Sequence, residues 1–175
     1  MFASITLMAI NSIAAPKFAE LYSEKNMKGL KKIVQQSTKM IFWSTLPLLI
    51  IFFLFPSFFL GIFGPEFEEL GVNAFILLSI GMLISAFSGS VGNLLQMTGR
   101  QFIFMKVLFV GALFNIGLNY FLIPNTNPFS IYGIHGINGA AVASMLSVII
   151  WNLSMVYIVK KQFGFLTIYL PFMEK

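Results

Sequence analysis

MIFWSTLPLLIIFFLFPSFFLGIF, residues 40–63, contains no charged side chain and is long enough to cross the ~30 Å hydrocarbon core of a bilayer as a helix. Three further apolar runs of comparable length follow it, at residues 72–96, 102–123 and 137–159. The sequence therefore predicts a core of four complete transmembrane helices within residues 40–159. The expected fold class is an all-α integral membrane protein.

The composition agrees with a protein whose main solvent is lipid. Hydrophobic residues make up 58% of the chain and charged residues 10%, whereas a soluble domain carries about 25% charged residues. The net charge is +5, but the basic residues flank apolar runs and do not form an aromatic-interleaved soluble surface. We therefore expect anionic membrane lipids, and not nucleic acid, as the partner of these charges.

The order of the four runs along the chain predicts on which side of the membrane the basic residues lie. If the runs cross alternately, all eleven Lys and Arg residues fall on one face of the membrane. These residues are Lys17, Lys25, Lys28, Lys31, Lys32, Lys39, Arg100, Lys106, Lys160, Lys161 and Lys175. By the positive-inside rule that face is cytoplasmic. The sequence predicts a multi-pass protein of the cytoplasmic (inner) membrane, with its basic loops and C-terminus inside.

The parts outside the four runs have different compositions. Residues 1–15 are apolar but too short to cross alone, and their first basic neighbour, Lys17, follows them. That order is typical of the end of an inward-running helix, so we expect residues 1–15 to be the end of a truncated transmembrane helix. Residues 16–39 are expected to form a cytoplasmic amphipathic linker, and residues 160–175 a cytoplasmic or interfacial tail.

Four amide side chains interrupt the apolar runs. A helical projection of residues 72–96 places Gln96 on a face rich in Gly and Ser, with Asn93 beside it, and residues 102–123 carry Asn115 and Asn119 on one face. An amide at membrane depth is costly unless it meets a partner or a wet cavity. These four residues are therefore candidates for a substrate cavity or for helix contacts, and plain packing between helices is the alternative.

The sequence lacks residues that metal binding, enzyme catalysis and ion coupling usually require. The chain has no cysteine, one histidine (His135) and no aspartate, and all six glutamates lie outside the four runs. We therefore expect no metal site, no cofactor and no enzyme activity. A membrane-buried carboxylate, which an ion-coupled carrier would be expected to use, is absent from these runs.

Five local strings occur in order along the chain: APKFAELY (15–22), FGPEF (63–67), GNLLQMTGRQ (92–101), NIGLNYFLIP (115–124) and GINGAAVAS (136–144). Each is weak alone. Together they resemble the C-terminal half of oligosaccharide-lipid flippases. These are the polysaccharide biosynthesis transporters of the superfamily that also contains the multidrug and toxin extrusion exporters.

The resemblance implies a fold and a function. The chain would be the C-terminal bundle of a two-bundle exporter, and the missing N-terminal bundle would be its partner. The implied activity is alternating-access translocation of an undecaprenyl-diphosphate-linked oligosaccharide for surface polysaccharide biosynthesis. In that reading Arg100 is a candidate contact for the diphosphate, because a guanidinium binds phosphate oxygens in a bidentate manner. A topology anchor at an inside turn is the alternative role for Arg100.

Two other functions stay open at this point. The first is an ion-coupled multidrug exporter of the same superfamily. The second is a small structural membrane protein whose helices pack within a larger complex.

Overall fold

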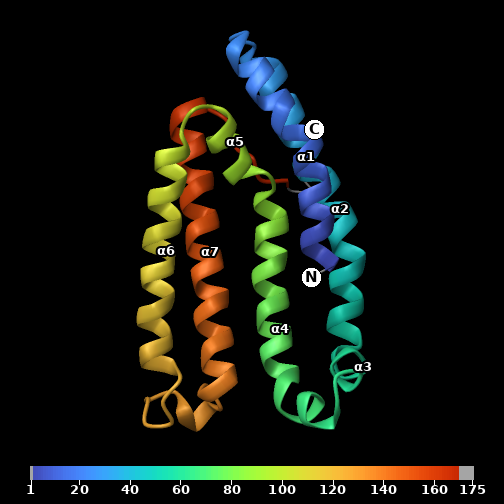
Figure 1. Cartoon of the computed structure of the whole chain (residues 1–175), viewed down its shortest axis with the longest axis vertical. Coiled ribbons are helices and arrows are strands. Elements are labelled where there is room, and N and C mark those ends of the chain that lie inside the picture. Colours follow the sequence, from blue (N-terminus) through green and yellow to red (C-terminus); the bar gives the residue numbers. More distant parts are fainter. Residues whose placement is uncertain (1, 170–175) are drawn as a thin grey trace.

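The computed structural model describes residues 2–169, of which residues 2–7 are described by their backbone alone. Within that part of the chain every regular element is helical and no strand occurs (Figure 1). In chain order the elements are α1 (Phe2–Ser23), α2 (Met27–Leu54), α3 (Pro56–Gly61), α4 (Pro65–Ser88), α5 (Val91–Met97), α6 (Gln101–Leu122), η1 (Ser130–Tyr132) and α7 (Gly136–Phe163). The predicted all-α class is confirmed. Lys175 and the part of the predicted tail beyond residue 169 lie outside the described residues.

Four helices, α2, α4, α6 and α7, are long and apolar enough to cross a membrane, which agrees with the predicted number. The third and fourth match the predicted runs closely. The first two differ from the prediction in their bounds, and in both cases a residue with a special backbone preference explains the difference.

The first predicted span, residues 40–63, does not form one helix. α2 begins at Met27 and ends at Leu54, and the rest of the apolar run forms the separate helix α3. Phe55 leaves the helical region, with φ −129° and ψ 47°, because the following Pro56 disfavours the helical conformation of the residue before it. Pro56 then starts α3, where its missing N–H costs nothing.

The second predicted span, residues 72–96, is not one helix. α4 ends at Ser88, because Gly89 adopts φ 66° and ψ −140°, and a new short helix, α5, begins at Val91. Positive φ favours glycine, which has no Cβ to clash with its own backbone. The helical projection that placed Gln96 on the same face as the residues of α4 is therefore wrong.

α1 is continuous from Phe2 to Ser23, with Pro16 inside it, so no helix ends at residue 15. A tight turn then reverses the chain into α2. Lys25 has φ 58°, and the side chain of Asn26 accepts a hydrogen bond from the backbone N–H of Gly29 at 2.9 Å. This bond satisfies one of the open donors at the start of α2.

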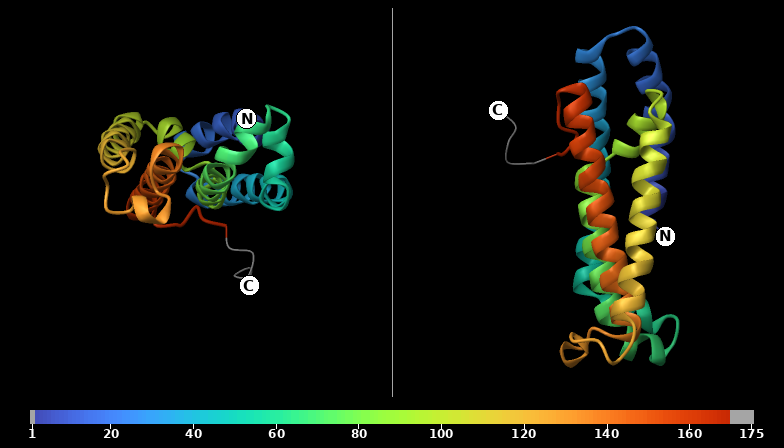
Figure 2. Two further views of the ribbon diagram at one scale, coloured as in Figure 1. Left: turned by 90° about the horizontal axis from the view of Figure 1, so that it is seen from below. Right: turned by 90° about the vertical axis from the view of Figure 1, so that its left-hand side faces the viewer.

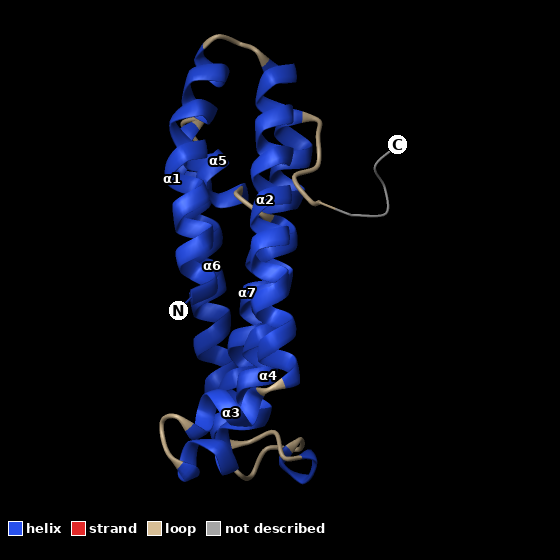
Figure 3. Ribbon diagram, turned by 90° about the vertical axis from the view of Figure 1, so that its right-hand side faces the viewer, coloured by secondary structure: helices blue, strands red, loops and turns tan. Residues whose placement is uncertain are grey.

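The helices form two layers, seen from one end and from the sides in Figures 2 and 3. One layer contains α2, α4 and α7, with α4 packed between the other two. The second layer contains α1 and α6, and the short α5 lies between them at one end of the molecule (Figure 1).

The two ends of the molecule differ in charge. The α1–α2 turn, the α5–α6 turn and the end of α7 lie at one end, here called the basic end (Figure 1). Lys28 lies in the first turn of α2, Arg100 directly precedes α6, and Lys160 and Lys161 lie in the last turn of α7. The opposite end carries α3, the acidic first turn of α4 and the loop between α6 and α7.

The hydrophobic core of the chain lies towards the basic end. Its cluster joins α1, α2, α5, α7 and the segment after α7. Its fully buried members include Phe18, Leu30, Val34, Leu94 and Val159. By contrast, α6 buries only Gly111 and Leu122, so most of its apolar surface is open to lipid or to another protein segment.

Candidate functional site

The four candidate amides form two separate pairs. Asn93 and Gln96 lie on α5, at the basic end. Asn115 and Asn119 lie on α6, roughly 21 and 27 Å along the helix axis from its start at the basic end. The structure therefore does not bring all four residues to one site.

Asn115 and Asn119 are joined to each other. The Asn119 Nδ2 donates a hydrogen bond to Asn115 Oδ1 at 2.9 Å, across one helical turn, and both side chains are half-buried. An amide has two N–H donors and an oxygen with two lone pairs, and the bond uses only one N–H of Asn119 and one lone pair of Asn115. The pair therefore keeps capacity for further polar partners.

Asn119 opens onto a groove of about 730 Å³ at the end opposite the basic end. Such a volume lies within the range of about 300–1,000 Å³ that is typical of small-molecule sites. The groove is formed by the last turns of α6 and the loop that follows. Its lining residues are Ile116, Asn119, Tyr120, Phe121, Ile123, Pro124, Thr126, Asn127 and Pro128. The lining mixes aromatic rings with neutral polar groups and contains no charged side chain.

Asn127 fixes the shape of this groove. The two N–H groups of its buried Nδ2 are shared among the carbonyls of Leu122, Pro124 and Ile134, which lie at 2.9, 2.6 and 2.9 Å. Its Oδ1 accepts a hydrogen bond from the backbone N–H of Phe129 at 2.8 Å. Asn127 is not among the residues that the sequence singles out, because its partners are carbonyls that converge only in the folded loop.

Asn93 and Gln96 have different surroundings. Both are half-buried, and Gln96 Nε2 donates to the carbonyl of Gly92, on its own helix, at 3.4 Å. Gly92 faces Phe104 on α6 so closely that a Cβ would lie 2.8 Å from the ring. This neighbourhood is a close contact between α5 and α6.

Arg100 holds three elements together at the basic end. Its Nη1 donates to the Tyr22 hydroxyl at 3.0 Å and to the Thr98 carbonyl at 3.2 Å. The guanidinium carbon lies 4.4 Å from the ring centroid of Phe163 and 5.4 Å from that of Tyr22, so the cation packs against two aromatic rings. Tyr22 is in α1 and Phe163 ends α7, and neither was identified from the sequence as a partner of Arg100.

The segment that follows α7 returns to α2 and α4. The Tyr169 hydroxyl accepts a hydrogen bond from Trp43 Nε1 at 3.2 Å, and its backbone N–H donates to the Phe87 carbonyl at 3.4 Å. Lys39 Nζ lies 5.6 Å from the centroid of the Tyr169 ring. Phe165, in the same segment, is buried in the core. The segment after α7 therefore packs against α2, the end of α4 and the core.

Within residues 2–169 no group of three or more His, Asp or Glu side chains is placed to hold a metal ion. The polar groups that the structure gathers are amides, hydroxyls, backbone carbonyls and one guanidinium. These groups can bind neutral polar ligands and anions by hydrogen bonds, but none is placed as a nucleophile with a base.

Comparisons with known proteins connect this arrangement to a family. A protein-family model described as MatE matches residues 1–121. An uncharacterized membrane protein of Methanocaldococcus jannaschii is 28% identical over an alignment of 158 residues, which covers 87% of this chain and 28% of that protein. The chain thus spans less than a third of the length of this relative. No solved structure gives a significant match.

Proposed function

The chain belongs to the MatE family, and from this membership we propose that it supplies one helix bundle of a membrane transporter that moves a lipid-linked oligosaccharide across the cytoplasmic membrane. A second bundle, from outside this chain, would complete the substrate pathway. In this proposal the basic end faces the cytoplasm, because lysine and arginine are enriched on that side of membrane proteins.

The observation that carries the choice of cargo is the Asn115–Asn119 pair beside the groove at the opposite end. A sugar presents many hydroxyls, each of which donates and accepts hydrogen bonds, so neutral amides and hydroxyls can bind it. Asn119 and its neighbour Tyr120 supply such groups at the groove. An organic cation would instead be stabilised by a carboxylate, and no acidic residue lies among the groove-lining residues.

The proposed mechanism is alternating access. The two bundles rock against each other around the headgroup while the lipid tail stays in the bilayer. The amide pair exchanges its partners between water and sugar hydroxyls as the pathway opens and closes. Arg100 remains our candidate for the diphosphate at the cytoplasmic side, since its hydrogen bonds to Tyr22 and Thr98 use one of its three nitrogens.

A transport assay tests the proposal. The full-length protein is reconstituted in liposomes and offered either a fluorescent undecaprenyl-diphosphate-linked oligosaccharide or a fluorescent organic cation. We expect translocation of the lipid-linked sugar and not of the cation. Gradient-dependent uptake of the cation alone would support an ion-coupled multidrug exporter. Movement of neither compound would support the structural membrane protein.

A further inference from the structure

α1 and α2 enclose a second groove, of about 470 Å³, near the basic end. α1 contributes side chains between Ala9 and Lys17, and α2 contributes side chains between Ile33 and Met40. The two helices run in opposite directions, so Lys17 and Ile33 lie towards the basic end, whereas Ala9 and Met40 lie deeper. From Lys17 to Ala9 the groove extends about 12 Å along α1.

The deep part of the groove is apolar. Its α1 wall consists of Ala and Ile side chains, and Ile13 is 80% exposed at the rim. Ser37 adds no free polar group to the wall, because its hydroxyl lies 3.0 Å from the carbonyls of both Ile33 and Val34 within its own helix. An apolar group such as an acyl chain therefore suits this part of the groove better than a polar one.

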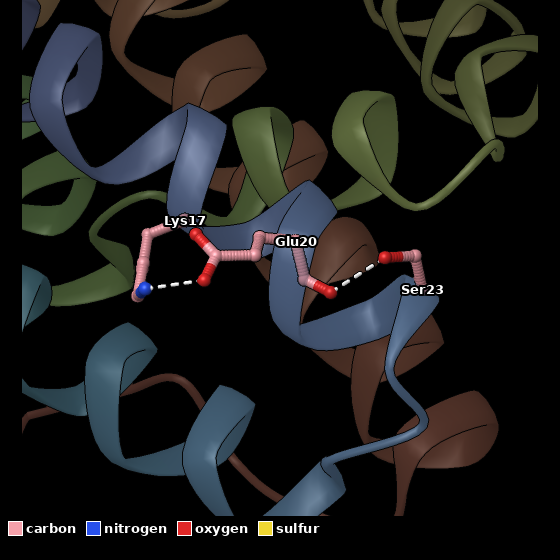
Figure 4. Close-up of polar contacts among 3 residues, drawn as sticks. All are labelled: Lys17, Glu20 and Ser23. Carbon is pink, nitrogen blue, oxygen red and sulfur yellow. Dashed lines mark hydrogen bonds and ion pairs between the residues drawn. The ribbon is translucent and has the colours of Figure 1, made fainter.

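The shallow part of the groove carries one cationic side chain, Lys17. Lys17 lies at its rim and forms an ion pair with Glu20, with 2.6 Å between Nζ and Oε1 (Figure 4). This hydrogen bond to Glu20 is the main cause that raises the pKa of Lys17 above its ordinary value. Since an ammonium has three N–H donors, two remain for another acceptor. Gln36, from α2, lines the same groove and offers a neutral donor.

The wider surroundings add positive charge. Residues 16–39 carry six lysines against two glutamates, and they form the end of α1, the turn and the first half of α2. Figure 1 shows this helical hairpin extending beyond the α5–α6 turn at the basic end. A hairpin of this kind attracts anionic headgroups at a membrane surface.

We propose that the α1–α2 groove binds one anionic phospholipid of the membrane, with an acyl chain between the two helices and the phosphate against Lys17 and Gln36. The groove has an apolar deep part and a lysine at its rim. A phospholipid in a bilayer leaflet likewise has its acyl chains deeper than its charged phosphate. This inference does not depend on the cargo of the transporter, and its test measures lipid binding rather than transport.

The test uses the full-length protein in detergent, titrated with phosphatidylglycerol or with phosphatidylcholine of identical acyl chains, and bound lipid is counted by native mass spectrometry. We expect one phosphatidylglycerol to bind about fivefold more tightly than phosphatidylcholine. Lys17→Gln should abolish this preference. The matched control Lys31→Gln, on an exposed α2 position outside the groove, should retain it. Equal effects of both variants would show diffuse surface attraction only and would overturn the site.

A second pair of variants tests the apolar part. Ala9→Phe fills the groove and should weaken both lipids, whereas Ala112→Phe, at an exposed position of α6, should change neither. Phosphatidylglycerol with a photoreactive acyl chain should label residues 9–17 and 33–40. Labelling elsewhere, or cross-links showing that another segment of the full-length protein fills the groove, would refute the proposal. Displacement by polyprenyl diphosphate at lower concentration would assign the groove to the cargo and refute it as well.

Discussion

Arg100 and Tyr22 are 78 residues apart in the sequence, and Arg100 Nη1 donates a hydrogen bond to the Tyr22 hydroxyl at 3.0 Å. Through this bond the turn before α6 is fastened to the end of α1, and the packing of Arg100 on Phe163 adds the end of α7. A positive residue that would set topology by its charge alone has thus become the centre of a cation–π contact. The planar shape of the guanidinium, and not only its charge, therefore helps to hold α1, α6 and α7 together at the basic end.

Arg100→Lys keeps the positive charge but loses the planar group that packs on two rings, and arginine and lysine are not equivalent in such sites. We expect this variant to lower stability by about 1–2 kcal/mol. The loss of stability is measured as a lower unfolding temperature of the full-length protein, with size-exclusion chromatography after heating as the readout. Lys31→Arg, at an exposed position, is the control and should unfold at the wild-type temperature. An unchanged unfolding temperature for Arg100→Lys would show that the packing of the guanidinium on the two rings does not stabilise the fold.

Asn115→Leu combined with Asn119→Leu removes the hydrogen-bonded amide pair of α6. If these amides bind sugar hydroxyls, transport of the lipid-linked oligosaccharide should fall about tenfold or more, while protein level in the membrane stays normal. Ala112→Leu, on an exposed position of the same helix, is the control for added apolar bulk. Undiminished transport by the double variant would show that both asparagines serve only helix packing and do not bind the sugar.

Gly89→Ala should destabilise the protein by about 2–4 kcal/mol. The substitution has two costs. Gly89 has φ 66°, which alanine disfavours, and a Cβ at this position would overlap the side chain of Thr38 on α2. Gly99→Ala is the matched control, since Gly99 also has a positive φ, 76°, but nothing lies within 4 Å of its added Cβ. The control should lose only about 1–2 kcal/mol. Equal unfolding temperatures for the two variants would show that the contact with Thr38 does not constrain the helix break.

Asn127→Leu leaves three backbone carbonyls, of Leu122, Pro124 and Ile134, without the amide that they share. We expect a loss of about 1–3 kcal/mol and faster amide hydrogen exchange in residues 124–134, since buried acceptors would lose their donor. Asn125→Leu, at an exposed position in the same loop, should leave exchange unchanged. Normal exchange in Asn127→Leu would mean that the loop holds its shape without this side chain.

The orientation is tested by reporter fusions in the full-length protein. Fusions at Glu69 and Asn127 should report the outside of the cytoplasmic membrane, and fusions at Lys28, Arg100 and Lys161 the inside. Alkaline phosphatase is active only outside and green fluorescent protein fluoresces mainly inside, so the two reporters control each other. A reversed result at any two positions would contradict the proposed topology.

How far the sequence predicts the fold depends on the element. α6 (Gln101–Leu122) was anticipated within two residues at each end, because its apolar run is bounded by turn-forming residues on both sides. α4 and α5 were merged into one predicted span, since a hydropathy pattern has no feature that marks a backbone turn at Gly89. α2 was placed too far along the chain, because its first half is amphipathic and polar whereas its second half is apolar.

The candidate site divides in the same way. The sequence identified Asn115 and Asn119 because an amide within an apolar run is visible as a local exception, and their spacing of four residues places them on one helix face. It did not identify Asn127 or the partners of Arg100. Those roles depend on carbonyls and rings that come from other turns and other helices.

By itself, the sequence determined the all-helical class, the number of membrane-crossing helices and the segregation of basic residues, since each depends on composition summed over a local window of chain. Only the tertiary structure decided where α4 breaks, which amides lie together and what Arg100 contacts. The physical reason is that these features require a second segment at close range. Thr38 faces Gly89, and Tyr22 and Phe163 face Arg100, only after helices that are distant in the sequence have packed side by side.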